Sequence, residues 1–407
     1  MFTISRSSIQ RALQYLAGVT LGSLLLLGAP AMAQTRPSLS QLHQQLEALQ
    51  QQVTAQHTTI TAQQTALMAQ QTTITAQQTT ITTLTTRLGL VEANPALALG
   101  PYVSVELSPL DGLPGPHILW SGANLHVRSG SGATDGVLTG QGNLLVGYNE
   151  NSSGAGSHNI IVGQGHTFTS FGGLVAGDFN TISAPYASVT GGQGNAASGL
   201  RASVSGGFDN SASGDGSSVS GGRGNRASGV TASAGGGDSN EARHTSASVH
   251  GGFANLASGE GSSISGGQQN ISSGQNAHIS GGQQNISSGP NASVSGGQRN
   301  TSSGLNASIS GGTNNGASGD FASVSGGWFS LASGEGASVS GGFANLASGE
   351  GASVSSGNAN TASGVNASVS GGFFNTASGE TSTVSGGVAR SALATYDWVA
   401  GGLFQTQ

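Results

Sequence analysis

The stretch GGFANLASGEG fills residues 251–261, and the same eleven residues return at 341–351. The two copies begin 90 residues apart, and the sequence between them shows a period of fifteen. From about residue 174 an aliphatic residue marks that period. It stands at Val189, Val204, Val219, Ala234, Val249, Ile264, Ile279, Val294, Ile309, Val324, Val339, Val354, Val369 and Val384. Because ninety is six fifteens, the two copies fill equivalent places six repeats apart.

Other columns of the repeat hold small or amide residues. Ala stands two residues before the aliphatic column in most repeats, and a Gly pair follows it. An Asn column comes next, at Asn195, Asn210, Asn225, Asn240, Asn255, Asn270, Asn285, Asn300, Asn315, Asn345, Asn360 and Asn375. A fixed period without helical spacing predicts a solenoid of stacked parallel β-strands, with one coil to each repeat.

The alternation within one repeat predicts how a coil folds. Ala337 and Val339 should point into the coil while Ser338 points out of it. The Gly pair allows the first corner because Gly takes positive φ at little cost, and Gly349 should let the second corner close. Each Asn should bond to the Asn above and below it, as in the amide ladders of stacked strands.

Residues 38–90 follow a different period, of seven. The first apolar positions are Leu39, Leu46, Val53, Ile60, Leu67, Ile74, Ile81 and Leu88, and four of the positions three further on are Gln56, Gln63, Gln70 and Gln77. This heptad predicts an α-helical coiled-coil stalk. Ile with polar core partners favours three strands, whose Gln side chains could bond around the axis. The alternative is a disordered Gln/Thr-rich linker.

Composition limits the functional classes. The chain has 407 residues with 70 Gly, only 7% charged residues, no Cys and a net charge of −6. The acidic balance disfavours nucleic-acid partners, which require a basic face. The absence of Cys excludes disulfides and thiolate metal sites. We expect no catalytic residues, metal or cofactor.

The N-terminal residues predict export. Arg6 and Arg11 precede an apolar run that ends at Ala31-Met32-Ala33, the pattern of a signal peptide over residues 1–33. The alternative, a membrane anchor, is disfavoured because the run is short and interrupted by Gly. The mature chain should therefore lack an integral membrane segment and act at the cell surface or in secreted form, with the periplasm as a further destination.

The remaining segments complete the domain plan. Residues 97–173 are predicted to form a β-rich adaptor with irregular first coils, residues 174–392 the regular solenoid, and residues 393–407 a C-terminal cap. In the adaptor, PYVSVEL predicts one strand and HILWSGANLHV a strand pair around a Gly turn.

The repeat ASVSGGFANLASGEG at residues 337–351, with its siblings, resembles the head repeat of the trimeric autotransporter adhesins, the YadA-like head. That resemblance covers about residues 174–392. It implies a left-handed parallel β-roll, packed as a homotrimer. As a departure from that family, we expect no C-terminal membrane anchor here. The resemblance also implies a surface role in adhesion, with an extracellular protein or glycan as partner.

One column is a candidate ligand site. Phe208, Phe253, Trp328, Phe343 and Phe373 follow the Gly pair, where other repeats carry Gln, Arg or Thr. Exposed aromatic side chains suit binding to proteins or sugars. Alternatively they cover a corner of the roll or a seam between chains.

Three functional classes remain open. The first is a non-enzymatic, adhesin-like trimer that binds through its head, and the second is a structural spacer without a ligand. The third, a β-helix enzyme acting on polysaccharides, is disfavoured because it needs clustered acids and bases in a groove. The acids Asp215, Glu260, Asp320, Glu335, Glu350 and Glu380 share one turn column, and one acid per coil is too few for a calcium roll.

Overall fold

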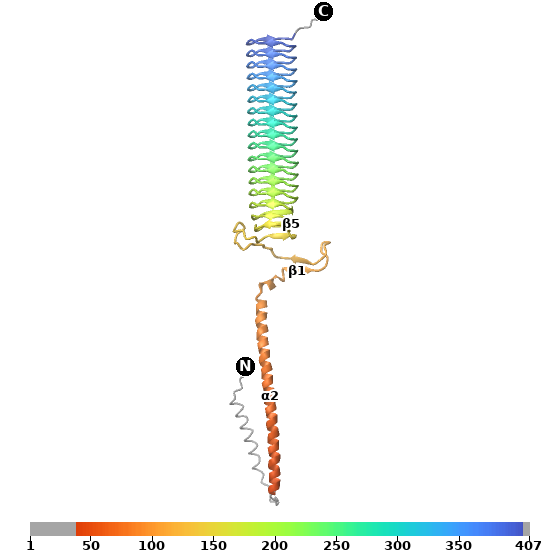
Figure 1. Cartoon of the computed structure of the whole chain (residues 1–407), viewed down its shortest axis with the longest axis vertical. Coiled ribbons are helices and arrows are strands. Elements are labelled where there is room, and N and C mark those ends of the chain that lie inside the picture. Colours follow the sequence, from red (N-terminus) through yellow and green to blue (C-terminus); the bar gives the residue numbers. More distant parts are fainter. Residues whose placement is uncertain (1–37, 402–407) are drawn as a thin grey trace. The chain divides into compact units, whose positions relative to one another are not determined.

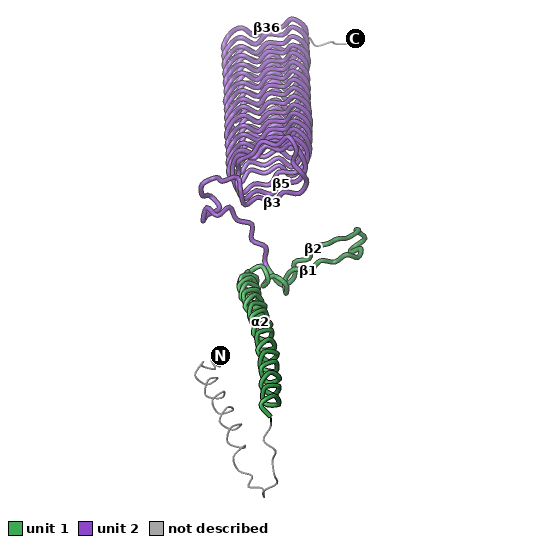
Figure 2. The backbone as a smooth tube through the Cα atoms, turned by 60° about the horizontal axis from the view of Figure 1, so that its bottom comes forward, with its two compact units in different colours: residues 1–123 green, residues 124–407 purple. Residues whose placement is uncertain are grey.

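A computed structural model describes residues 38–401 of the chain. The predicted signal peptide lies outside the described residues. The chain divides into two units, residues 1–123 and 124–407, which are coloured separately in Figure 2 and are described in turn.

The first unit contains one long helix, α2 (Leu39–Glu92). Ser38 caps its N-terminus: the Ser38 Oγ accepts the Gln41 N–H, and the Gln41 Oε1 accepts the Ser38 N–H at 3.0 Å. The 54 residues give a rod of about 80 Å. The heptad segment is therefore helical, and a short 3₁₀ helix, η1 (Pro95–Leu99), follows it.

No residue of α2 is buried within a single chain. The aliphatic heptad positions are 46% to 91% exposed, and the four Gln positions are exposed as well. Thr side chains along the helix donate to the carbonyl four residues earlier, as Thr72 Oγ1 does to Met68 O at 2.9 Å. These Thr hydroxyls thus find hydrogen-bond partners within the helix. The row of aliphatic heptad side chains, the heptad ridge, has no covering partner within the described chain.

The first unit also contains a β-hairpin, and its pairing differs from the predicted one. Strand β1 (Val103–Glu106) pairs antiparallel with β2 (His117–Trp120), with Val103 opposite Trp120. Residues 124–127 carry no strand. The prediction of a strand pair within HILWSGANLHV was therefore wrong: HILW pairs backward with the preceding strand across a longer loop.

The second unit is a parallel β-solenoid (Figure 1). Each regular coil contributes one strand to each of two parallel ladders, so the fold predicted from the fifteen-residue period is confirmed. One ladder contains β3 (Leu144–Val146), β5 (Ile160–Gln164), β7 (Leu174–Asp178), β9 (Ser188–Val189), β11 (Ser203–Val204), β13 (Ser218–Val219), β15 (Ser233–Ala234), β17 (Ser248–Val249), β19 (Ser263–Ile264), β21 (His278–Ile279), β23 (Ser293–Val294), β25 (Ser308–Ile309), β27 (Ser323–Val324), β29 (Ser338–Val339), β31 (Ser353–Val354), β33 (Ser368–Val369), β35 (Thr383–Val384) and β37 (Trp398–Val399).

The other ladder contains the strands that follow the Asn column. They are β4 (Ser153–Gly154), β6 (Thr167–Phe168), β8 (Thr181–Ile182), β10 (Ala196–Ala197), β12 (Ser211–Ala212), β14 (Arg226–Ala227), β16 (Glu241–Ala242), β18 (Leu256–Ala257), β20 (Ile271–Ser272), β22 (Ile286–Ser287), β24 (Thr301–Ser302), β26 (Gly316–Ala317), β28 (Leu331–Ala332), β30 (Leu346–Ala347), β32 (Thr361–Ala362), β34 (Thr376–Ala377) and β36 (Ser391–Ala392).

Coil length changes along the solenoid. The register pairs Leu144 with Ile160, Ile160 with Leu174, Leu174 with Ser188, and Ser188 with Ser203. The spacing is thus sixteen, then fourteen twice, then fifteen. In the fourteen-residue coils β5 and β7 run unbroken for five residues, whereas later coils have a two-residue strand and a separate one-residue bridge. The fifteenth residue is therefore a bulge between the buried aliphatic residue and the second Gly of the pair.

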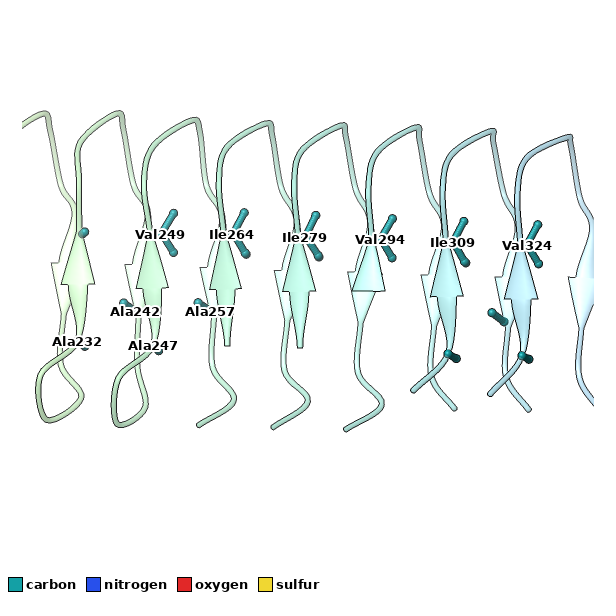
Figure 3. Packing of buried hydrophobic residues seen from close by; sticks show 14 of the residues in the cluster. Ala232, Ala242, Ala247, Val249, Ala257, Ile264, Ile279, Val294, Ile309 and Val324 are labelled. Atoms are coloured by element: carbon teal, nitrogen blue, oxygen red, sulfur yellow. The ribbon is translucent and has the colours of Figure 1, made fainter. Parts of the chain in front are cut away.

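The core is thin and repeats in every coil. Ala337, Val339 and Ala347 are at most 1% exposed, while Ser338 is half-buried and Ser340 exposed. Figure 3 shows the aliphatic side chains from Val249 to Val324 stacked in one line, with Ala242 and Ala257 on the strands behind them. Each coil buries few apolar atoms, so the solenoid depends on contacts between coils.

In most pairs only the second Gly needs to be Gly; at Gly221 and Gly386 the first Gly also has positive φ, 158° and 145°. Gly342 has φ of 89°, and a Cβ there would overlap the carbonyl oxygen of Gly357 in the next coil. A Cβ at Gly341 would meet nothing within 4 Å, and Ser356 occupies the same column one coil later. The expectation that both residues shape the corner was therefore half right. At the second corner Gly349 keeps ordinary φ and is needed because a Cβ would overlap the Gly364 carbonyl.

Gly342→Ala should therefore destabilise the solenoid by more than about 2 kcal/mol, because it adds both a strained φ and a steric overlap. Gly341→Ala, the matched control, should change stability by less than about 0.5 kcal/mol. Denaturant unfolding followed by far-UV circular dichroism measures both. Equal effects of the two variants would contradict this account of the corner.

Candidate functional site

The Asn column joins each coil to its neighbours mainly through backbone groups. The Asn285 N–H donates to the Asn270 Oδ1 at 2.9 Å, and the Asn285 Nδ2 donates to the carbonyls of Gly281 and Gly297, each at 3.0 Å. Asn285 is fully buried. Direct amide–amide bonds accompany this pattern in some coils, such as Asn270 Nδ2 to Asn255 Oδ1 at 3.1 Å. An Asn such as Asn285 thus donates hydrogen bonds to a carbonyl in the Gly corner of its own coil and to one in the Gly corner of the next coil.

The same ladder reaches further back than the sequence pattern indicated. His166 is fully buried in this column. Its Nδ1 accepts the Asn180 N–H at 3.2 Å, so its Nε2 carries the proton that it shares with Val162 O at 3.0 Å. The imidazole makes the two kinds of contact that an Asn amide makes elsewhere. The fourteen-residue spacing of these coils hides His166 from a search at fifteen.

Among the described coils of fifteen residues, the ladder is interrupted at Ser330 and ends at Arg390, whose N–H donates to the Asn375 Oδ1. The Ser330 N–H still donates to the Asn315 Oδ1 at 3.0 Å, but Ser330 has no amide to offer the Gly corners. Its Oγ is buried and has no hydrogen-bond partner. Nor can Asn345, one coil on, bond to an Asn Oδ1 as its counterparts do.

The predicted aromatic column lies on the outside of the solenoid, on the one-residue bridges that follow the bulge. Its five side chains are between 41% and 57% exposed, and Trp328 and Phe343 are bridge partners in adjacent coils. Phe208 and Phe253 lie several coils away. The column is therefore one small cluster with separate outliers rather than a continuous strip.

Two further aromatic residues join this column, and the sequence analysis missed them. Phe329 and Phe374 stand just before the ladder position and are each 55% exposed; Phe179 holds the same position before Asn180 and is 49% exposed. The Phe329 and Phe343 rings meet edge to face at 5.9 Å, and Phe373 and Phe374 do so at 4.2 Å. Comparison of the residue before the Asn column across repeats would have revealed them, because most repeats carry a small or polar residue there.

A shallow hollow of about 360 Å³ lies beside Phe329. Its lining residues come from three successive coils and combine apolar, amide, hydroxyl and guanidinium groups. They are Arg299, Thr301, Asn314, Asn315, Gly316, Phe329, Ser330 and Leu331. Gly316 opens this hollow, since it places no side chain on the outer face of β26.

Some charged side chains form hydrogen bonds within the turns and strands. Asp215 Oδ1 accepts the Leu200 N–H at 3.1 Å, and Asp320 Oδ1 accepts the Leu305 N–H at 2.9 Å, each one coil back. On the even-numbered ladder the hydrogen bond from Arg243 Nη2 to Glu241 Oε2, at 2.7 Å, lowers the pKa of Glu241. Within residues 38–401 no three His, Asp or Glu side chains gather as a metal site would require.

Among the described residues, no helix combines the length and apolarity needed to span a membrane. Neither a protein-family model nor a curated protein matches the chain significantly.

Removal of one ladder amide should cost far more than removal of a surface amide in the same coil. Asn360→Ala would leave the Asn375 N–H and the Ser356 carbonyl unpaired and would remove one of the two hydrogen bonds to the Gly372 carbonyl, which keeps the Asn358 N–H, at a cost of roughly 2–4 kcal/mol. Asn358→Ala, two residues away and outside the ladder, should cost less than about 0.5 kcal/mol. Urea unfolding of both variants tests this, and equal midpoints would argue against the ladder.

Ser330→Asn should repair the interruption. The new amide can donate to the Gly corners and accept the Asn345 N–H, which should stabilise the solenoid by about 1–2 kcal/mol. The unfolding midpoint measured in urea would rise if this is correct. A fall in the midpoint would show that the coil around Ser330 cannot accommodate the regular ladder.

Proposed function

We propose that the chain is an exported, non-enzymatic homotrimer, in which α2 forms a coiled-coil stalk and the solenoid a binding head, acting as an adhesin-like surface or secreted fibre. The observation that carries this proposal is the uncovered heptad ridge of α2. A helix of 54 residues with no buried side chain gains nothing from its aliphatic positions unless other helices cover them. Ile at the first core position of the heptad, with Gln at the core position three residues further on, favours a coiled coil of three helices.

The surface of the solenoid supports lateral association. On the ladder that includes β29, the outward-pointing strand residue is Ser in most coils, as at Ser338 and Ser353. The exposed residue two positions later, as at Ser340, is also mostly Ser. Such a face is nearly free of charge and presents only short side chains, so another copy can approach it closely. The small apolar core of each coil favours such association. The left-handed winding implied by the YadA-like resemblance stays a prediction.

Binding through the head is supported by the exposed aromatic side chains. No contact within the coil requires Trp328, Phe329 or Phe343, because other coils place polar or small residues in the same columns. The structural spacer is the alternative, and it predicts no ligand. A polysaccharide-active enzyme is disfavoured, since acids of the turn column such as Asp215 and Asp320 are used to cap backbone N–H groups.

The trimer can be tested with charge substitutions on the two sides of α2. Ile74→Asp places a carboxylate in the proposed core and should dissociate the mature protein to monomers. Thr79→Asp places the same charge on the outer side of the helix and should leave the trimer intact. Sedimentation equilibrium measures the mass of each, and a monomeric unmodified chain would refute the proposal.

The adhesive role can be tested with the purified mature chain on immobilised extracellular matrix and on cell-surface glycans. We expect saturable binding that the Ile74→Asp variant, if it separates the chains, retains with lower avidity, because one chain offers one site where three offer several. Binding to none of these surfaces would favour the spacer.

A further inference from the structure

The coil over residues 316–330 departs from the repeat in three columns at once. Gly316 stands where β24 and β28 carry Thr301 and Leu331, and Ser330 stands in the Asn column. Phe329 fills a turn position that neighbouring coils give to Asn314 and Ala344. The first two departures remove side chains and the third adds a ring, so that a hollow opens beside an aromatic wall.

Phe329 sits at a place that is unfavourable for its side chain. Its φ is 55°, a left-handed conformation that costs a bulky residue roughly 1 kcal/mol or more. Burial does not offset that cost, because the side chain is 55% exposed and its recorded ring contact is with Phe343. The left-handed φ itself belongs to the turn, because Asn314 (55°) and Ala344 (53°) share it in the neighbouring coils. What distinguishes Phe329 is a bulky, exposed ring where those coils place a smaller side chain.

The aromatic cluster does not fit a seam between parallel copies. A seam that runs along the axis meets every coil in the same way, so its columns should be uniform. The column of Trp328 and Phe343 is instead polar in most other coils, at Gln193, Arg223, Asp238, Gln268, Gln283, Gln298, Thr313 and Asn358. This variation argues against a seam between copies of the chain.

The size and polarity of the cluster favour a glycan over a protein. Stable protein interfaces cover about 800 Å² on each partner. Trp328, Phe329, Leu331 and Phe343 span two coils, only about 10 Å of the axis at the usual strand spacing. A pyranose ring has an apolar C–H face that stacks on an aromatic ring and a rim of hydroxyls. Around the hollow, Asn314, Thr301 and Arg299 offer the amide, hydroxyl and guanidinium groups that such a rim requires.

We propose that this cluster is a glycan-binding platform. One pyranose ring stacks on Phe329 with its hydroxyls toward the hollow, and Trp328 and Phe343 hold neighbouring rings. The pair Phe373 and Phe374 repeats the arrangement three coils on, about 14 Å along the axis, so a linear oligosaccharide lying along the solenoid can reach both. This assignment rests on the proposal that the head binds a ligand.

The test uses the full mature chain, with cellohexaose, chitohexaose, maltohexaose and a hexameric uronate as probes in isothermal titration calorimetry. Phe329→Asn should weaken binding of the preferred oligosaccharide at least tenfold, and Trp328→Gln should do the same. Both replacements are residues that other coils use in the same columns, and Asn suits the left-handed turn, so the unfolding midpoint should not fall. Phe208→Gln, the matched control in a distant coil, should bind as the unmodified chain does.

The outcomes separate this assignment from the broader proposal. If the chain binds an oligosaccharide and Phe329→Asn leaves that binding unchanged, the platform is overturned. It is also overturned if the chain binds matrix proteins but no sugars, and Phe329→Asn abolishes that protein binding. Dissociation of the trimer by Phe329→Asn would assign the cluster to the seam. If the unmodified chain binds neither sugars nor matrix, the binding role of the head fails together with the platform.

Discussion

The solenoid depends on one constraint: each coil must supply hydrogen-bond partners for the backbone N–H and C=O groups of the coils next to it. With only one aliphatic and two Ala side chains buried in a coil such as that of Val339, apolar burial alone cannot define a unique stack. The parallel ladders and the buried Asn amides provide that definition, because each amide is satisfied only when two successive Gly corners lie in register. The second Gly of each pair is required for the same reason, since any side chain there would separate the coils.

Much of this arrangement could be predicted from the sequence, because equivalent positions in many coils must meet the same packing and hydrogen-bonding requirements and therefore carry similar residues. The fifteen-residue period, the inward Ala and Val columns and the helical heptad are visible without a structure. Other features depend on what one coil does to the next. The positions of Gly341 and Gly342 look alike in sequence, and only the stack shows which one meets a neighbour's carbonyl. The hairpin of β1 and β2 escaped prediction although Asp111-Gly112, a dipeptide typical of two-residue turns, lies in the loop that joins the strands; Leu110 and Leu113 pair across it.

The candidate site was only partly predictable for a related reason. The aromatic residues after the Gly pair were predicted, but Phe329 and Phe374 were missed, although most repeats carry a small or polar residue in their column. Their contacts with Phe343 and Phe373 arise from stacking, which brings neighbouring columns within reach. The departures at Gly316 and Ser330 carry meaning only against the regularity of the other coils. In a repeat protein of this kind, function is to be sought where the repeat is broken.

The central claim is that coils with so thin a core stand together in three copies, with their short Ser faces inward and the aromatic cluster outward. Electron cryomicroscopy of the mature chain tests it most directly. The account predicts three parallel solenoids packed together and a three-stranded coiled coil, with Trp328 and Phe329 at the outer surface. A solitary solenoid, or a trimer with these rings in its seam, would contradict it.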